Sequence, residues 1–249
     1  MVFDEYAQYY DVLYQDKDYE REVEYLAGLI NKYAPGAKQL ADLGCGTGKH
    51  AELLTEYGYR EHGVDMSADM LKSAENRAKG NKNLSFQCAR LQDFSLAEPA
   101  DAVTALFHVM SYQTTDGMVL DALQNIYRNI RGGGIFIFDC WYGPAVLLQR
   151  PELRVKRMEN DKVKVTRIAE PVMRENENIV EVNYDIFVEN KAANTIHEIR
   201  ERHVMRYFFK DEIKRFIESI GFSLIDSFEF MSGRPLSKDT WGSCFIVKK

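Results

Sequence analysis

The 249-residue chain has few cysteines, no long apolar run and no excess of basic residues. Its four cysteines include no C-x-x-C pair, so neither a zinc site nor a redox dithiol is indicated, and we expect buried free thiols. No apolar stretch approaches the roughly 20 residues that cross a bilayer. The first five residues lack the basic and apolar regions of a signal peptide. These absences predict a cytoplasmic protein with no membrane partner and no metal site.

The charge balance narrows the class of partner. Acidic residues outnumber basic residues by 38 to 32, which gives a net charge of −6 at neutral pH. This balance disfavours nonspecific binding to nucleic acid, because the phosphate backbone attracts basic proteins. The chain is 45% hydrophobic and 28% charged, a mix typical of a folded globular protein. We therefore expect a small-molecule partner and no nucleic acid, and the composition leaves a homodimer open.

Strand and helix patterns alternate five times in the first part of the chain, which predicts a parallel sheet. Apolar runs predict buried strands over residues 39–43, 61–65, 83–87, 100–108 and 135–138. Apolar residues at helical spacing predict helices over residues 18–33, 49–57, 67–79 and 116–130. The glycine-rich residues 131–134 are expected to end the helix over residues 116–130.

The pattern changes after Pro144. Strict alternation of apolar and polar residues over 180–188, with extended-looking segments on either side, predicts three or four antiparallel strands. A helix over 210–221 and two strands over 222–230 and 244–247 then return to the first pattern. We predict an α/β fold in which residues 1–150 and 209–249 form a Rossmann-like domain. Residues 151–208 are expected to form an inserted antiparallel β-sheet that covers the substrate.

The strongest motif is Asp42-Leu43-Gly44-Cys45-Gly46-Thr47-Gly48, which lies between a predicted strand and a predicted helix. Glycines allow a tight turn and let a ligand approach the main chain closely. Asp65 stands at the end of the next strand, where a carboxylate can accept hydrogen bonds from ribose hydroxyls. The two features together predict a nucleoside-type ligand at the carboxyl edge of the sheet.

The spacing of the glycines separates two classes of nucleoside ligand. A dinucleotide fingerprint, G-x-G-x-x-G, would need glycine at the position of Lys49, so a nicotinamide oxidoreductase is disfavoured. The form Asp-x-Gly-x-Gly-x-Gly, with an acid after the second strand, resembles class I S-adenosylmethionine (SAM) methyltransferases. The resemblance implies SAM as cofactor and the following contacts to it: Tyr14, Tyr19, Asp42, Gly44, Cys45, Gly46, Gly48, Asp65, Met66, Leu91, Gln92, Leu106 and Phe107.

One cofactor contact departs from this pattern. In many such enzymes an acid after the third strand meets the adenine amino group, and Arg90 stands at that position here. The backbone of Leu91 or the side chain of Gln92 is expected to replace it.

A closer resemblance extends over nearly the whole chain. The segments 10–14, 17–19, 101–112, 139–144 and 232–245 are similar to the sugar N,N-dimethyltransferases that make the dimethylamino deoxysugars of macrolide antibiotics. Two residues depart from that family: His108 replaces a residue that is commonly small, and Ser111 replaces the glycine before Tyr112. The resemblance therefore implies methylation of a small amine more firmly than it identifies the acceptor.

The candidate catalytic residues are His108 and Tyr14. His108 follows the fourth strand at the ligand-binding edge, and a neutral imidazole can take a proton near neutral pH. Tyr14 is expected either to lie over the cofactor or to pack in the core, because it shares a helical stripe with Tyr6 and Tyr10. The expected substrate contacts are Tyr112, Trp141, Tyr142 and Arg234. The remaining histidines have no metal-ligand spacing and are assigned no chemistry.

We predict an enzyme, a SAM-dependent methyltransferase whose best acceptor is the amino group of a nucleotide-linked amino sugar. An O-methyltransferase acting on a sugar or another small metabolite is the alternative within the same class. A SAM-binding regulatory module without turnover is the alternative from another class.

Overall fold

The computed structural model describes residues 6–249; the first five residues, on which the expected lack of a signal peptide rests, lie outside the described residues. The helices are α1 (Ala7–Leu13), α2 (Tyr19–Tyr33), α3 (Lys49–Glu56), α4 (Ala68–Ala78), α5 (Asp116–Asn129), α6 (Gly143–Gln149) and α7 (Lys210–Ile220), with 3-10 turns η1 (Val109–Tyr112) and η2 (Glu175–Glu177). The strands are β1 (Gln39–Leu43), β2 (Arg60–Asp65), β3 (Leu84–Cys88), β4 (Ala100–Ala105), β5 (Ile130–Trp141), β6 (Arg154–Glu159), β7 (Val163–Arg174), β8 (Ile179–Asn190), β9 (Thr195–Arg206), β10 (Ser223–Glu229) and β11 (Gly242–Lys248).

The main sheet has seven strands in the order β10-β11-β5-β4-β1-β2-β3. Strands β1 to β5 pair in parallel, and β11 pairs antiparallel with both β5 and β10. The chain runs from β1 outward to β3 and then returns to the other side of β1 with β4. Open α/β sheets bind ligands at such a reversal, outside the carboxyl ends of the strands. The predicted Rossmann-like fold is therefore confirmed, and its topology directs attention to the ends of β1 and β4.

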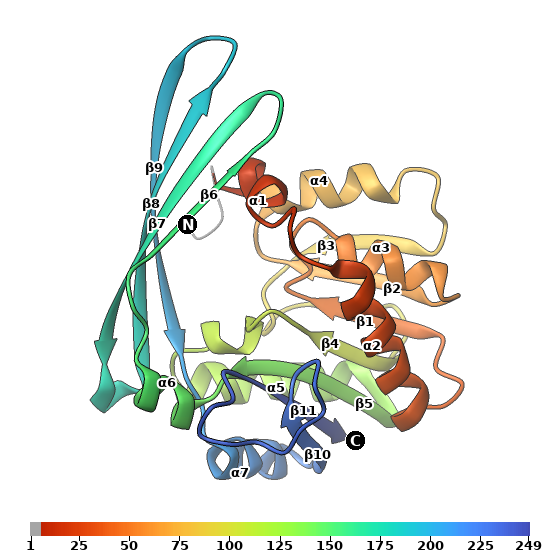
Figure 1. Ribbon diagram of the computed structural model, residues 1–249. Helices are drawn as coiled ribbons and strands as arrows, with labels where there is room; N and C mark the ends of the chain where they lie inside the picture. Colours follow the sequence, from red (N-terminus) through yellow and green to blue (C-terminus); the bar gives the residue numbers. More distant parts are fainter. Residues whose placement is uncertain (1–5) are drawn as a thin grey trace.

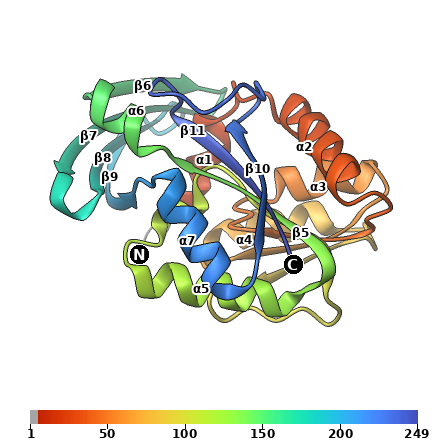
Figure 2. The same ribbon diagram turned by 90° about the horizontal axis from the view of Figure 1, so that it is seen from below.

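Helices cover both faces of the main sheet. Apolar residues of α2, including Leu26 and Ile30, pack with Leu54 of α3 on one face. Leu123 and Ile126 of α5 pack with Ile217 of α7 on the other. Figure 2 shows α5 and α7 on the opposite side of the sheet from α2. These two cores hold the strand ends in place without closing the carboxyl edge.

The second sheet is antiparallel, with the order β6-β7-β8-β9, and stands beside the carboxyl edge of the main sheet (Figure 1). The expected alternation is present in β8, where Val180, Val182, Ile186 and Val188 are buried. Leu13 of α1 packs against one end of this inner face, and Val146 of α6 packs against the other. The middle of the inner face is left to line the space between the two sheets. Within residues 6–249, no helix is long and apolar enough to cross a membrane.

The fourth strand is shorter than predicted. The sequence predicted a strand as far as residue 108, but β4 ends at Ala105, and Phe107 and His108 adopt left-handed backbone angles with φ of +63° and +66°. The Asp139 carboxylate accepts a hydrogen bond from the His108 backbone N–H at 2.9 Å, which favours the turn. The apolar run therefore covers both a strand and the start of a loop.

Helix α5 ends at Asn129, just before the glycine-rich residues 131–134, as the sequence predicts, but these residues lie inside the next strand rather than before it. Strand β5 begins at Ile130 and includes the glycines, and its register with β4 shifts between Ala100 and Ala102. A Cβ at Gly134 would lie 2.7 Å from the Ile130 side chain and 2.8 Å from the Asp101 carbonyl oxygen. Glycine at this position thus permits close approach at a bulge inside the strand.

All four cysteines are free thiols. Cys45, Cys140 and Cys244 are buried as expected, whereas Cys88 is exposed at the end of β3. Burial raises the pKa of the Cys45 and Cys244 thiols well above the ordinary value. These two thiols are therefore protonated near neutral pH and act as packing groups.

Glu61 on β2 is an unusual buried acid. It is 3% exposed, and neither carboxyl oxygen has a hydrogen-bond partner among residues 6–249. Burial, and to a smaller extent the Asp42 carboxyl group, raise the pKa of Glu61 well above its ordinary value. The folded protein therefore keeps the Glu61 proton at a pH where the unfolded chain has lost it.

We expect Glu61→Gln to reduce the pH dependence of stability. The contribution of Glu61 to the free energy of unfolding should fall as pH rises above about 4.3, the ordinary Glu pKa, by up to about 1.4 kcal/mol per pH unit until the raised pKa is reached. Urea unfolding at several pH values measures this slope. Glu56→Gln on exposed α3 surface is the control and should keep the wild-type slope. Equal slopes for Glu61→Gln and wild type would contradict this account.

Candidate active site

The three glycines of the loop between β1 and α3 have different surroundings. A Cβ at Gly44 would lie 2.3 Å from Val109, and one at Gly48 would lie 2.7 Å from Phe86. These two positions need glycine because neighbouring side chains pack against them. A Cβ at Gly46 would meet nothing within 4 Å. Gly46 therefore offers open space against the main chain, as a bound ligand requires.

Asp65 connects this loop to the next one. Its Oδ2 accepts a hydrogen bond from the Gly46 backbone N–H at 2.8 Å, and its Oδ1 accepts one from the Ser67 N–H at 2.8 Å. Burial raises the pKa of Asp65, and the backbone N–H groups around it oppose that rise. A carboxylate has about four lone-pair sites, so further acceptor capacity remains for a ligand hydroxyl.

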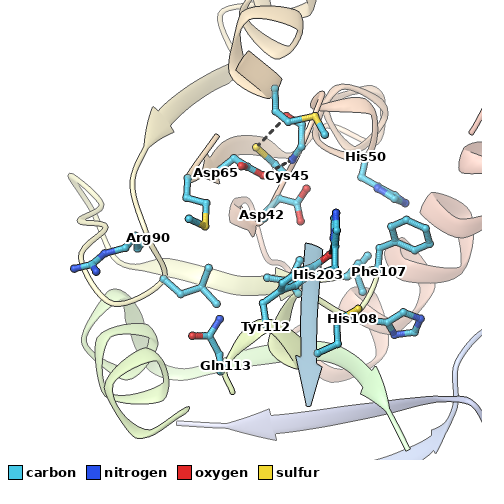
Figure 3. Close-up of a pocket in the computed structure, with 18 of the residues that line it drawn as sticks. Asp42, Cys45, His50, Asp65, Arg90, Phe107, His108, Tyr112, Gln113 and His203 are labelled. Atoms are coloured by element: carbon cyan, nitrogen blue, oxygen red, sulfur yellow. Dashed lines mark hydrogen bonds between the residues drawn. The ribbon is translucent and has the colours of Figure 1, made fainter. Parts of the chain in front are cut away.

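A cavity of about 930 Å³ lies between the two sheets at this edge. Most of the residues predicted from the sequence line it: Tyr14, Tyr19, Asp42, Gly44, Cys45, Gly46, Asp65, Met66, Leu91, Gln92, Leu106, Phe107, His108, Tyr112 and Trp141. In Figure 3, Asp42, Cys45 and Asp65 lie on one side of the cavity, and Tyr112 and His203 lie on the other. The structure thus brings together residues from the glycine loop, the loop after β4, η1, the end of α1 and both sheets.

Three predicted site residues lie outside this cavity. Gly48 packs against Phe86, as described above. Tyr142 is the residue before α6, and its backbone N–H donates to the Trp241 carbonyl oxygen at 3.0 Å. Arg234 has a 72% exposed side chain that pairs with Glu229 at 2.6 Å. Sequence position after a strand was a poor guide for Tyr142 and Arg234, because each belongs to a connection that leads away from the cavity.

Helix α1 is fastened to the glycine loop. The Thr47 hydroxyl donates to Asp11 at 2.8 Å, and Arg77 of α4 pairs with Asp11 at 2.6 Å. This anchoring brings Tyr14 to the cavity, where its ring meets Phe107 edge-on at 5.2 Å. The Arg167 guanidinium donates to the Tyr14 oxygen at 3.0 Å. Because arginine cannot accept a hydrogen bond, the Tyr14 proton stays available for another acceptor.

The segment after β3 forms the opposite end of the cavity. The Gln92 side-chain amide donates to the Gln113 side-chain oxygen at 2.6 Å, which leaves the Gln92 oxygen as an acceptor. Arg90 pairs with Asp93 at 2.5 Å and is largely exposed. Arg90 therefore lines the cavity as part of an ion pair, next to the acceptor groups of Leu91 and Gln92.

His108 lies at the margin of the main cavity. Its Nδ1 is 2.9 Å from the Asp139 carboxylate, and its ring meets the ring of Trp141 edge-on at 6.2 Å. It also lines a second cavity of about 400 Å³, shared with Lys17 and Phe107. In Figure 3 the imidazole is directed away from the centre of the main cavity, where Tyr112 and His203 lie.

The sequence reasoning missed His203 and Glu201. His203 Nδ1 lies 2.8 Å from the Tyr112 hydroxyl, and its Nε2 lies 3.0 Å from the Glu201 carboxylate. The signal that could have found them is their spacing, since residues two apart on a strand share one face. Metal-ligand spacing, the one pattern on which the histidines other than His108 were judged, does not detect this arrangement. Within residues 6–249, no group of three or more His, Cys, Asp or Glu side chains is arranged to hold a metal ion.

Comparison with known proteins agrees with this geometry. A family model described as a methyltransferase domain matches residues 40–134, which include the glycine loop and Asp65. The chain is 28% identical to the dTDP-3-amino-3,6-dideoxy-alpha-D-glucopyranose N,N-dimethyltransferase of Streptomyces fradiae over 93% of this chain and 87% of that protein.

Solved structures share the whole architecture. DesVI of Streptomyces venezuelae superposes with a TM-score of 0.81 at 22% identity, covering 98% of each chain. The SAM-bound amino pentose methyltransferase CalS10 of Micromonospora echinaspora superposes with a TM-score of 0.75 at 20% identity, covering 100% of this chain and 98% of that one. The protein is a class I SAM-dependent methyltransferase that resembles the sugar N-methyltransferases.

Proposed function

We propose that this methyltransferase acts on the amino group of a nucleotide-linked amino sugar. The observation that carries the proposal is that the glycine loop of the main sheet and Tyr184 and His203 of the second sheet line the same cavity. Such a cavity has room for an acceptor beside the cofactor. The relative from Streptomyces fradiae is named for an acceptor of this kind.

The residues around the glycine loop fit SAM. We propose that Asp65 holds the ribose hydroxyls, that Gly46 faces the methionine portion, and that Leu91 and Gln92 meet the adenine. The open space at Gly46 and the spare acceptor capacity of Asp65 support these roles. When bound, SAM supplies a methyl group on a sulfonium, which leaves as a thioether when a lone pair attacks the methyl carbon.

The other side of the cavity is proposed to hold the acceptor. Tyr14, Tyr112 and Trp141 line the acceptor side of the cavity and exclude water from it. Alignment of two reactants in such a space can lower the activation barrier by roughly 7–11 kcal/mol. His108, oriented by Asp139, is proposed to position the acceptor from the cavity margin. We also propose that residues 151–208 form the acceptor-covering subdomain of the chain.

We expect Asp65→Asn to weaken SAM binding by about 1.5–3 kcal/mol, or roughly 10- to 150-fold in Kd, because charge-assisted hydrogen bonds are lost. Isothermal titration calorimetry with SAM measures this change. Asp121→Asn is the control, because Asp121 lines the same cavity on exposed α5 surface and should leave the affinity close to wild type. Unchanged affinity in Asp65→Asn would remove Asp65 from the cofactor site.

We expect Gly46→Ala to raise the Kd for SAM by more than about 10-fold, equivalent to about 1.4 kcal/mol, because the new methyl group enters the proposed ligand space. Gly58→Ala is the matched control. Both glycines have positive φ, +55° and +88°, and both have open surroundings, so the backbone strain should be similar. Only Gly46 lines the cavity. Equal SAM affinities for the two variants would show that the loop is structural at this position.

To test the proposed acceptor, the protein is incubated with SAM and dTDP-3-amino-3,6-dideoxy-α-D-glucopyranose. Mass spectrometry then measures whether the sugar gains the mass of methyl groups. We expect the amino sugar to gain methyl groups and the matched sugar with a hydroxyl in place of the amine to gain none. Methylation of the hydroxyl sugar alone would instead identify an O-methyltransferase. No methylation of either sugar by a protein that binds SAM would contradict the proposed acceptor.

A further inference from the structure

Three polar side chains form a line from the second sheet into the main cavity. Glu201 and His203 lie on one face of β9, and Tyr112 lies in η1, 91 residues earlier in the chain than His203. The side chains of His203 and Glu201 are 2% and 5% exposed. Tyr112 and His203 both line the cavity. The line therefore begins at a carboxylate shielded from water and ends at a phenol facing the proposed acceptor.

The chemistry of the three groups gives the hydrogen bonds a direction. A carboxylate only accepts, so Glu201 fixes the imidazole as the tautomer with its proton on Nε2. Nδ1 of His203 then carries a lone pair and accepts the Tyr112 O–H at 2.8 Å. Tyr112 also lines the cavity, so its oxygen can accept a proton from a ligand there while its own proton passes to His203.

The surroundings keep Tyr112 protonated. Burial raises the pKa of Tyr112 well above its ordinary value, and Tyr184, Tyr14, Glu201 and Asp65 add to the rise. The Tyr184 ring meets the His203 ring edge-on at 4.6 Å and holds the imidazole in place. A tyrosine of this kind cannot serve as a standing base, but it can receive one proton while it gives its own to His203.

We propose that Glu201, His203 and Tyr112 form a proton relay that accepts the proton released by the methyl acceptor, an inference that rests on the proposed function. The acceptor nitrogen forms a bond to the methyl carbon while the carbon–sulfur bond breaks and its electron pair stays on sulfur. In the same step an N–H proton of the acceptor passes to the Tyr112 oxygen, and the Tyr112 proton passes to Nδ1 of His203. The resulting imidazolium is paired with Glu201 until it loses its proton to water.

The relay does not include His108, the histidine that the sequence suggested as the base. His108 is paired through Nδ1 with Asp139 and directed away from the cavity centre (Figure 3). The relay instead ends at Tyr112, inside the cavity. Proton acceptance is thus assigned to Tyr112 of η1 and His203 of the second sheet, and positioning is assigned to His108 in the loop after β4.

The relay is tested first without any acceptor, by nuclear magnetic resonance of the protein with isotope-labelled histidine. His203→Asn identifies the His203 signals by their loss. We expect His203 to be neutral with its proton on Nε2, Tyr112→Phe to shift its Nδ1 resonance, and Glu201→Gln to shift its Nε2 resonance. A proton on Nδ1 of His203 in the neutral protein would overturn the relay.

The second test measures kcat with SAM and dTDP-3-amino-3,6-dideoxy-α-D-glucopyranose from neutral pH upward. We expect Tyr112→Phe and His203→Asn to lower kcat by about 10²-fold at neutral pH, the lower end of general-base effects, with SAM affinity unchanged. The loss should shrink as pH rises, because hydroxide takes over the proton. His108→Gln should lose only a few-fold, as a positioning residue.

His197→Gln is the matched control, because His197 lies on the same face of β9 but in its exposed part, and it should retain the wild-type rate. A loss in Tyr112→Phe that does not change with pH would indicate a structural role and overturn the relay. If the wild-type protein methylates neither this sugar nor its hydroxyl counterpart, the proposed function fails, and the tautomer of His203 decides the relay by itself.

Discussion

The hydrogen bonds of the Asp65 carboxylate are the interaction on which the rest of the site depends. One oxygen accepts a hydrogen bond from the Gly46 N–H in the loop after β1. The other accepts one from the Ser67 N–H in the turn between β2 and α4. Ser67 in turn caps α4 by accepting a hydrogen bond from the Met70 N–H at 3.2 Å. A single buried carboxylate therefore keeps two loops at a fixed separation at the carboxyl edge, which sets the shape of the cavity there.

A second carboxylate, Asp139, shapes the other side of the same edge. It accepts a hydrogen bond from the backbone N–H of His108 and lies 2.9 Å from the imidazole Nδ1, and the chain after β4 turns there into left-handed geometry. This turn places Phe107 on the cavity, where its ring meets Tyr14 of α1. Tyr14 is itself held by Arg167 of the second sheet. Contacts that begin at Asp139 thus join the main sheet, α1 and the second sheet around one space.

The proposed chemistry divides between these two sheets. The main sheet supplies main-chain surface and a carboxylate, which suit a nucleoside-type cofactor. The second sheet supplies Tyr184, Glu201 and His203, and η1 adds Tyr112. These side chains suit an acceptor that must be oriented and must lose a proton. Methyl transfer from a sulfonium needs alignment more than activation of the leaving group, so an enclosed space between two rigid sheets is well matched to it.

The sequence by itself determined the elements that depend on local pattern. Apolar periodicity predicted most strands and helices, and the glycine spacing with Asp65 predicted the nucleoside site, because these signals act between residues near one another in the chain. Only the tertiary structure decided that Arg234 and Tyr142 lie outside the cavity and that His108 faces its margin. The same holds for the contact of His203 with Tyr112. These outcomes depend on how distant segments pack, and a side chain's position after a strand does not specify which neighbour it will meet.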